Sequence, residues 1–325
     1  MVISDGLDET PSSITTDTHD ETIDFSMNNA FTVDVEDYFQ VTAFADTVVL
    51  SSWHQHESRV EKNTHAVLEL LAERGIRGTF FVLGWVAKRY PTLVNDISRQ
   101  GHEIASHGMN HQLVYNQSPA EFREETRSAK RLLEDICQSP VIGYRAATYS
   151  ITRRSLWALD VLAEEGFLYD SSIFPMHHDR YGIPDAKPVP HLMETSKGHR
   201  LVEFPISVLR YKGMTLPVAG GGDFRIFPYS VTRWGLKKLN TSGQEFVFYI
   251  HPWEVDPAQP RIANAGLLSR FRHYYNLGLC RSRLQSLLGD FTFAPLRTIL
   301  QERDLLVRDA ERFTINIHAR AEKLS

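Results

Sequence analysis

Short apolar runs alternate with longer amphipathic segments from residue 29 onward. Runs such as 30–35 (AFTVDV) and 78–83 (GTFFVL) are almost continuously apolar, which is typical of strands buried on both faces. The segment 60–74 repeats its apolar residues every three or four positions, which predicts an amphipathic helix. Strands that alternate with crossover helices predict an α/β fold with a parallel sheet, either doubly wound or closed into a barrel.

The same pattern defines the expected elements and parts of the chain. The predicted strands are 30–35, 78–83, 102–106, 141–144, 167–170 and 245–250. The predicted helices are 60–74, 91–100, 120–136, 153–165, 267–288 and 295–303. Between about 176 and 228, six prolines and Gly-Gly-Gly at 220–222 indicate long loops with short strands. We therefore expect a tail over 1–28, an α/β body over 29–256 with this loop-rich insertion, and a helical extension over 257–325.

The formal charge of −5 comes from the tail. Residues 1–28 hold seven Asp and Glu and no Lys or Arg, while the other 297 residues hold 35 basic and 33 acidic residues. A segment this acidic and this poor in aromatic residues buries too little apolar surface to order itself. We expect disorder there, and Met27 could be the start of the protein.

The composition excludes several classes of protein. An apolar content of 42% and an aromatic content of 11% are those of an ordinary globular chain. No stretch reaches the roughly 18–20 apolar residues of a membrane span, and the N-terminus lacks the pattern of a signal peptide. Cys137 and Cys280 are too few for a disulfide or metal framework, and no basic stripe indicates nucleic acid. We expect a cytoplasmic enzyme without a transmembrane segment or a nucleic-acid partner.

Polar side chains collect at the carboxyl ends of the predicted strands, where active sites of parallel α/β folds form. They are Asp34, Glu36, Asp37, His107, His111, Arg145, Asp170 and His251. Each residue alone is weak evidence, and their shared position is the signal.

A metal site is one hypothesis for this edge. His107 and His111 could bind one metal, although the glutamate of a zinc-protease HExxH motif is absent. With a carboxylate they would make a set suited to Zn²⁺ or a similar ion. Asp34 and Glu36 share a strand face, so one could bind the metal while the other accepts a proton from water. The alternatives are a chance histidine pair and acids that cap the next element.

The remaining three residues have competing interpretations. His251 could be a third ligand, a general acid or a structural histidine. Arg145 could keep a catalytic carboxylate ionised, and Asp170 could orient His251 and raise its pKa. For Arg145 and Asp170 the alternative is a structural salt bridge, since buried charges are rarely left unpaired.

In order and approximate spacing, these residues resemble the five motifs of the NodB-like polysaccharide deacetylases (carbohydrate esterase family 4), over roughly 29–256. The similarity is closer to the exosortase-associated deacetylases of exopolysaccharide loci. It is carried by TVDVEDYFQVTAF (32–44), TFFVLGWVAKRYP (79–91), GYRAATYSIT (143–152), YDSSIFP (169–175), GGGDFRIFPY (220–229), YIHPWEVDPAQPR (249–261) and FRHYYNLG (271–278).

The resemblance implies a distorted (β/α)7 barrel of the NodB type with a divalent metal at its mouth, Zn in the first place and Co, Ni or Mn as alternatives. It also implies removal of N-acetyl groups from a polysaccharide or its lipid-linked precursor, with release of acetate. By this resemblance Asp34 would be the general base, and His107 and His111 would bind the metal. Arg145 would hold Asp34 in place. His251 would be the general acid, oriented by Asp170.

Some assignments stay open. The family has adjacent Asp-Asp where this chain has Asp-Val-Glu-Asp, so the third ligand is Glu36, which we favour, or Asp37. A family proline is replaced near Ala147, so the loop there is expected to differ. The backbone N–H of Tyr149 would help to bind the oxyanion. The aromatic rings available to stack on sugar, or else to fill the core, are those of Tyr149, Phe224, Tyr229 and Trp253.

Two other functions compete with deacetylation: hydrolysis of a small cyclic amide or imide on the same fold, and polysaccharide binding by a non-catalytic barrel. An N-acetylated glycan substrate also implies exopolysaccharide assembly machinery as a partner. Because no export signal is visible, we expect the protein to act in the cytoplasm, at the inner face of the membrane.

Overall fold

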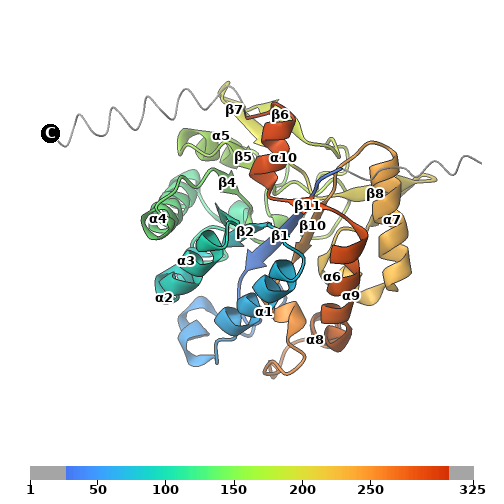
Figure 1. The fold of residues 1–325 in the computed structure, drawn as a ribbon. Coiled ribbons are helices and arrows are strands. Elements are labelled where there is room, and N and C mark those ends of the chain that lie inside the picture. The colour runs from blue at the N-terminus through green and yellow to red at the C-terminus, as the bar shows by residue number, and fades with distance from the viewer. Residues whose placement is uncertain (1–26, 307–325) are drawn as a thin grey trace, which may run out of the picture.

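The computed structural model describes residues 27–306, so the acidic tail up to residue 26 and the end of the expected extension lie outside the described residues. A curled sheet forms the centre, and helices surround it (Figure 1). The strand order is β10-β1-β2-β3-β4-β5-β7-β6, and β11 pairs with β1 beside this path. All neighbours pair parallel except β6 with β7. In the described chain β10 and β6 remain the two edges, so the barrel is open.

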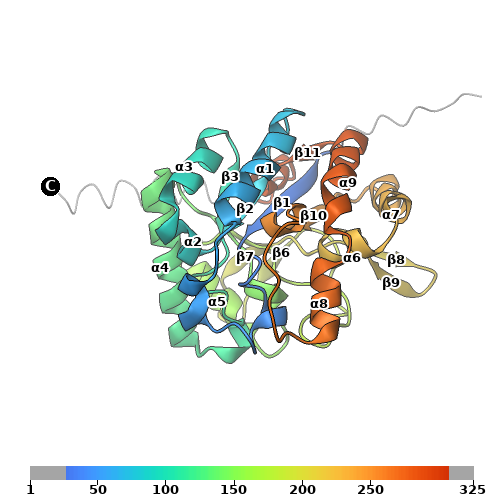
Figure 2. The same cartoon turned by 90° about the horizontal axis from the view of Figure 1, so that it is seen from below.

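The strands of this sheet are β1 (Asn29–Val35), β2 (Thr79–Val82), β3 (Glu103–Ser106), β4 (Gly143–Tyr144), β5 (Tyr169–Asp170), β6 (His191–Glu194), β7 (Arg200–Glu203), β10 (Val247–Ile250) and β11 (Phe293–Ala294). A separate hairpin is formed by β8 (Val208–Tyr211) and β9 (Met214–Pro217), and it projects beside α7 (Figure 2). The helices are α1 (Val60–Ala72), α2 (Gly84–Arg89), α3 (Pro91–Arg99), α4 (Pro119–Cys137), α5 (Trp157–Glu164), α6 (Gly221–Ile226), α7 (Tyr229–Thr241), α8 (Leu267–Tyr274), α9 (Leu277–Asp290) and α10 (Leu296–Glu302).

The α/β fold predicted from the alternating pattern is confirmed, with six predicted strands found close to their expected positions. Local signals explain several boundaries. Helix α4 begins after Ser118, whose side chain and that of Glu121 form a reciprocal capping box. The single helix predicted over 267–288 is wrong, because Asn276 adopts a left-handed conformation that divides it into α8 and α9.

Strand β1 is fully buried, and it separates two environments. Phe31, Val33 and Val35 belong to the main apolar core that includes residues of α1. Thr32 and Asp34 alternate with them and therefore point to the other side of the strand. Both are bonded there by one buried guanidinium, described below. The strand thus anchors the outer helices with one face and carries polar chemistry into the barrel with the other.

The chain after residue 256 is tied to the same sheet. Strand β11 pairs with the start of β1 at Asn29 and Ala30, and the Asn28 amide donates to the Glu302 carboxylate. Both described ends of the chain therefore lie at the amino ends of the strands. None of the helices in residues 27–306 is long and apolar enough to cross a bilayer.

Candidate active site

A pocket of about 270 Å³ opens at the carboxyl ends of β1, β3 and β10. Its walls include five of the polar residues that the sequence places at strand ends: Asp34, Glu36, His107, His111 and His251. These residues are far apart in the chain and converge because parallel strands end at one edge of a sheet.

Glu36, His107 and His111 form a cluster of potential metal ligands. One ligand atom from each lies within 4.8 Å of the others. Nε2 of His111 is 2.7 Å from the buried Oε2 of Glu36. Nδ1 of His107 lies 2.8 Å from the Arg145 carbonyl, which leaves the Nε2 lone pair free to face the cluster.

The charge and burial of these side chains favour the binding of a cation. Burial alone raises the pKa of Glu36, but the neighbouring imidazoles of His111, His251 and His107 outweigh it and lower the pKa to about 2. Burial lowers the pKa of His107 to about 4, so the ring is neutral at pH 7. The neutral imidazole of His107, the imidazole of His111 and the ionised, buried carboxylate of Glu36 fit a divalent metal ion.

Asp37, the alternative ligand, lies outside this cluster. Its Oδ2 accepts hydrogen bonds from Ser58 Oγ at 2.7 Å and from the backbone N–H groups of Arg59 and Val60 at 2.9 and 3.1 Å. It therefore caps the start of α1, and its carboxylate is committed to the helix N-terminus.

Asp34 is paired with the buried guanidinium of Arg145. Nη1 of Arg145 donates to Oδ1 of Asp34 at 2.7 Å and to Thr32 Oγ1 at 2.8 Å. Nε and Nη2 donate to the carbonyl and hydroxyl of Ser171. The second carboxylate oxygen of Asp34 stays on the pocket side, 3.9 Å from Nε2 of His251.

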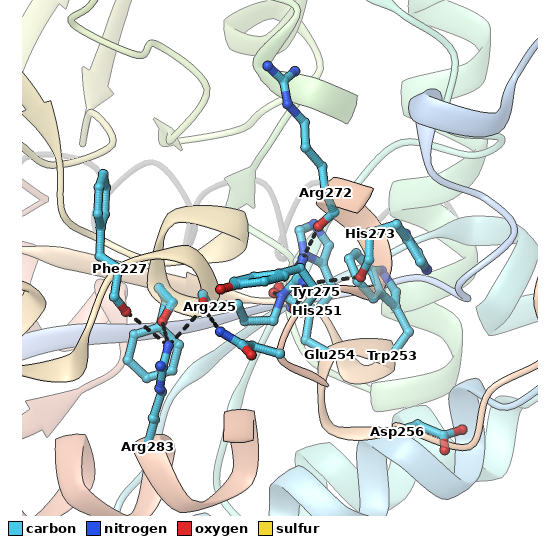
Figure 3. Close-up of polar contacts among 12 residues, drawn as sticks. Arg225, Phe227, His251, Trp253, Glu254, Asp256, Arg272, His273, Tyr275 and Arg283 are labelled. Carbon is cyan, nitrogen blue, oxygen red and sulfur yellow. Dashed lines mark hydrogen bonds and ion pairs between the residues drawn. The ribbon is translucent and has the colours of Figure 1, made fainter. Parts of the chain in front are cut away.

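His251 is held by Glu254, three residues later, and the pair is completed by Arg225 (Figure 3). Nδ1 of His251 lies 2.9 Å from Oε1 of Glu254, while Nε of Arg225 donates to Oε2 at 2.6 Å. Burial alone lowers the pKa of His251, but the carboxylates of Glu254, Glu36 and Asp34 raise it to about 9. The ring is therefore protonated at neutral pH.

Asp170 does not occupy the position that the sequence predicts. Both ring nitrogens of His251 face other carboxylates. Asp170 instead accepts hydrogen bonds from Ser172 and lies opposite Glu203 across the β5–β7 pair. Burial of the two adjacent carboxyls raises both pKa values, that of Asp170 to about 6. Orientation of His251 by Asp170 is therefore corrected to orientation by Glu254.

Two of the four candidate sugar-stacking rings lie away from the pocket. Phe224 is 1% exposed and packs edge-on against Phe248 in the core. The Tyr229 hydroxyl donates to Asp290 on α9. The stacking alternative therefore does not fit these two rings, because α6 and α7 turn them toward the barrel wall and α9, and the core alternative fits Phe224.

The other two aromatic residues line the pocket. The Trp253 ring stacks between His251 and His273, with centroid distances of 5.2 and 4.0 Å. Tyr149 follows Thr148 in a loop where both residues have positive φ, a strained backbone that is concentrated at functional sites. Its backbone N–H, however, donates to the Ala146 carbonyl at 3.0 Å. This N–H group is therefore already bonded within a turn, which does not fit the expected contact with an oxyanion.

Sequence reasoning missed Glu254, Arg225, His273 and Glu203. Only Glu254 had a local signal, because His-Pro-x-Glu is the pattern of a capped turn with the acid three residues after the cap. Arg225 and His273 come from α6 and α8, and nothing in the sequence places them beside His251.

Comparisons with known proteins show what parts of this chain are similar to. Residues 46–165 match the family model described as polysaccharide deacetylase, and residues 171–301 match a domain of unknown function, DUF3473. A chitooligosaccharide deacetylase of Bradyrhizobium sp. (strain ANU 289) is 33% identical over 100 residues, which are 31% of this chain and 43% of that protein. The chain thus matches less than half the length of this curated relative.

Solved structures share the fold. A putative polysaccharide deacetylase from Mycobacterium smegmatis superposes with a TM-score of 0.57 at 21% identity, over 84% of this chain and 88% of its own. Puue allantoinase superposes with a TM-score of 0.54 at 16% identity, over the same shares of the two chains. Over residues 46–165 this chain is thus similar to polysaccharide deacetylases, and over most of its length it shares the fold of a putative member of that group.

Proposed function

We propose that this protein is a metal-dependent deacetylase that hydrolyses the N-acetyl groups of an N-acetylated polysaccharide or its lipid-linked precursor and releases acetate. One observation carries the proposal. The metal-ligand cluster of Glu36, His107 and His111 lies in one pocket with a carboxylate held by an arginine and with a protonated histidine.

The metal site supports the hydrolytic part of the proposal. A divalent ion held by Glu36, His107 and His111 would polarise the acetyl carbonyl and lower the pKa of water. Zn²⁺ suits two imidazoles and a carboxylate and is the first ion to test, with Co, Ni and Mn as alternatives.

Asp34 is assigned the role of general base. Arg145 binds one of its oxygens and leaves the other on the pocket side. That oxygen accepts a proton from the attacking water, while Arg145 keeps the carboxylate in one orientation.

His251 is assigned the role of general acid. Glu254 holds Nδ1, so Nε2 carries the proton that faces the pocket. Amide hydrolysis needs this proton, because the nitrogen must leave as an amine rather than as an amide anion. Arg225 keeps Glu254 ionised through their 2.6 Å contact.

A sugar substrate is supported by the aromatic walls of the pocket and by the relatives. Trp253, Tyr149 and Tyr181 line the pocket, and such rings can stack on sugar faces. The matched relative is described as acting on chitooligosaccharide. We further propose membership in the exosortase-associated subgroup and an exopolysaccharide in the cytoplasm as the biological substrate, on the basis of the quoted motif segments.

Acetate release from N-acetylated glucosamine oligomers tests the proposal. We expect release by the full chain, its loss after chelation, and its return with Zn²⁺ or Co²⁺. Because an allantoinase shares the fold, a cyclic amide such as allantoin is the parallel substrate. Turnover of that compound without acetate release would replace the deacetylase proposal, and binding of oligomers without either reaction would favour a non-catalytic barrel.

A further inference from the structure

Helix α8 presents an exposed apolar face beside the pocket. Leu267, Leu268 and Phe271 are 83%, 62% and 54% exposed. The Tyr275 ring lies 4.9 Å from that of Phe271 and continues the surface. Single exposed apolar residues are normal on soluble proteins, whereas a contiguous cluster indicates an interaction site. These four residues are called the α8 face.

The opposite side of α8 is firmly attached, so the exposure is not that of a loose helix. His273 is 4% exposed and stacks on Trp253. Arg225 donates to the carbonyls of Arg272, His273 and Tyr275 at 3.0, 2.9 and 2.7 Å (Figure 3). The helix is therefore fixed by its C-terminal turn, with the α8 face directed outward.

The surroundings of the α8 face are basic. The stretch 257–289 contains five arginines and no Asp or Glu. Arg270 and Arg272 lie on α8 itself, and the Arg272 side chain points away from the Arg225 cluster in Figure 3. Arg180 is another exposed residue of the pocket wall. Asp223 is an acid close enough to Arg272 to interact electrostatically, so the patch is basic but not free of carboxylates.

We propose that the α8 face docks on the surface of an anionic lipid bilayer. The leucine and phenylalanine side chains would enter the boundary between headgroups and acyl chains, and the arginines would lie at the phosphates. Exposed apolar residues beside basic ones are what an interfacial helix requires.

Two other occupants fit less well. A second copy of the chain meeting through the same face would bring the arginine-rich, acid-free stretches together and juxtapose like charges. The described part of the chain begins and ends on the other side of the sheet, since Asn28 and Glu302 are bonded at the amino ends of the strands. The α8 face lies with the pocket at the carboxyl ends.

Docking in this way would set the pocket mouth at the level of the headgroups, because Leu268 and Arg272 also line the pocket. The docked protein would then present its active site to a lipid-linked glycan, a consequence that rests on the proposed function. The lipid contact itself does not depend on deacetylation and is tested without a substrate.

Co-sedimentation of the full chain with vesicles tests the inference. We expect binding to phosphatidylcholine vesicles that contain phosphatidylglycerol, little binding to phosphatidylcholine alone, and weaker binding as salt rises. The triple variant Leu267→Ser/Leu268→Ser/Phe271→Ser should reduce binding by roughly tenfold or more. Arg270→Gln should reduce it by a smaller factor.

The matched control is Met214→Ser/Val231→Ser, which removes residues that are 55% and 39% exposed outside the α8 face and should bind like the wild type. Thermal unfolding checks the fold, and the single variant Leu267→Ser serves if the triple variant is unstable. Unchanged binding by the α8 variants, or no wild-type binding to anionic vesicles, overturns the inference. So does a wild-type dimer that the triple variant abolishes while neither protein binds vesicles.

Discussion

Nδ1 of His251 lies 2.9 Å from Oε1 of Glu254, which also accepts the backbone N–H of His251 at 3.1 Å. One carboxylate oxygen therefore fixes both the turn and the ring of the same residue. The second oxygen is bound by Arg225. The carboxylate of Glu254 thus orients the proposed general acid at the end of β10, and Arg225 of α6 holds that carboxylate in place.

Replacement of this carboxylate tests the assignment. We expect Glu254→Gln to lower the pKa of His251, which the nearby carboxylates raise to about 9, and so to shift the basic limb of the pH–rate profile to lower pH. The loss in kcat should be roughly 10²–10⁴-fold, the usual contribution of a positioned acid or base. Asp170→Asn is the contrasting variant. A larger shift of the basic limb from Asp170→Asn than from Glu254→Gln would restore the role predicted from sequence.

Asp34 and His107 should separate chemistry from metal binding. Asp34→Asn removes the proposed base and keeps the ligand cluster, so we expect loss of acetate release with metal still bound. His107→Ala removes a ligand and should lose both. Metal content by elemental analysis, measured with acetate release on the same samples, distinguishes the two. Metal-free Asp34→Asn protein, or wild-type activity in it, would contradict the division of roles.

Arg145 should contribute to stability as well as to the site. Arg145→Met leaves Asp34 buried without its cationic partner, and loss of one member of a buried pair costs about 3–5 kcal/mol of unfolding free energy. Arg153→Met is the control, because the Arg153–Asp185 pair is 64% and 69% exposed and should contribute at most about 1 kcal/mol. Urea unfolding of both variants measures the difference. Equal losses would show that burial does not decide the effect.

The Asp170–Glu203 pair predicts a pH dependence of stability. Burial raises the pKa of both carboxyls in the folded state, that of Asp170 to about 6. A folded-state pKa above the unfolded value means that the folded protein binds the proton more tightly. The associated stability is therefore present below pH 4 and is lost as pH rises through 6 and above.

Glu203→Gln mimics the protonated form and keeps an acceptor for the Ile173 N–H. We expect the variant to gain stability relative to wild type as pH rises from 5 to 8, measured by unfolding at each pH. Parallel stability curves for the two proteins would show that the pair is not protonated as described.

The sequence was informative where the physical cause is local. An apolar run such as 30–35 is buried on both faces wherever it lies, and its alternation already places Thr32 and Asp34 on one side of the strand. The spacing of His107 and His111 likewise brings two imidazoles within reach of one ion. Turn chemistry explains Glu254, although the pattern was not used to predict its contact with His251.

Tertiary structure decided the contacts between distant segments. Arg225 and Glu254 are 29 residues apart, and Asp34 and Arg145 are 111 apart, so their pairing depends on how the strands and helices pack. The same packing placed Asp170 against Glu203, turned Phe224 and Tyr229 from the pocket, and brought His273 onto Trp253. Periodicity determines which face of an element is apolar. Only the assembled sheet determines which polar side chains share a buried, low-dielectric space, and that space sets their pKa values and their partners.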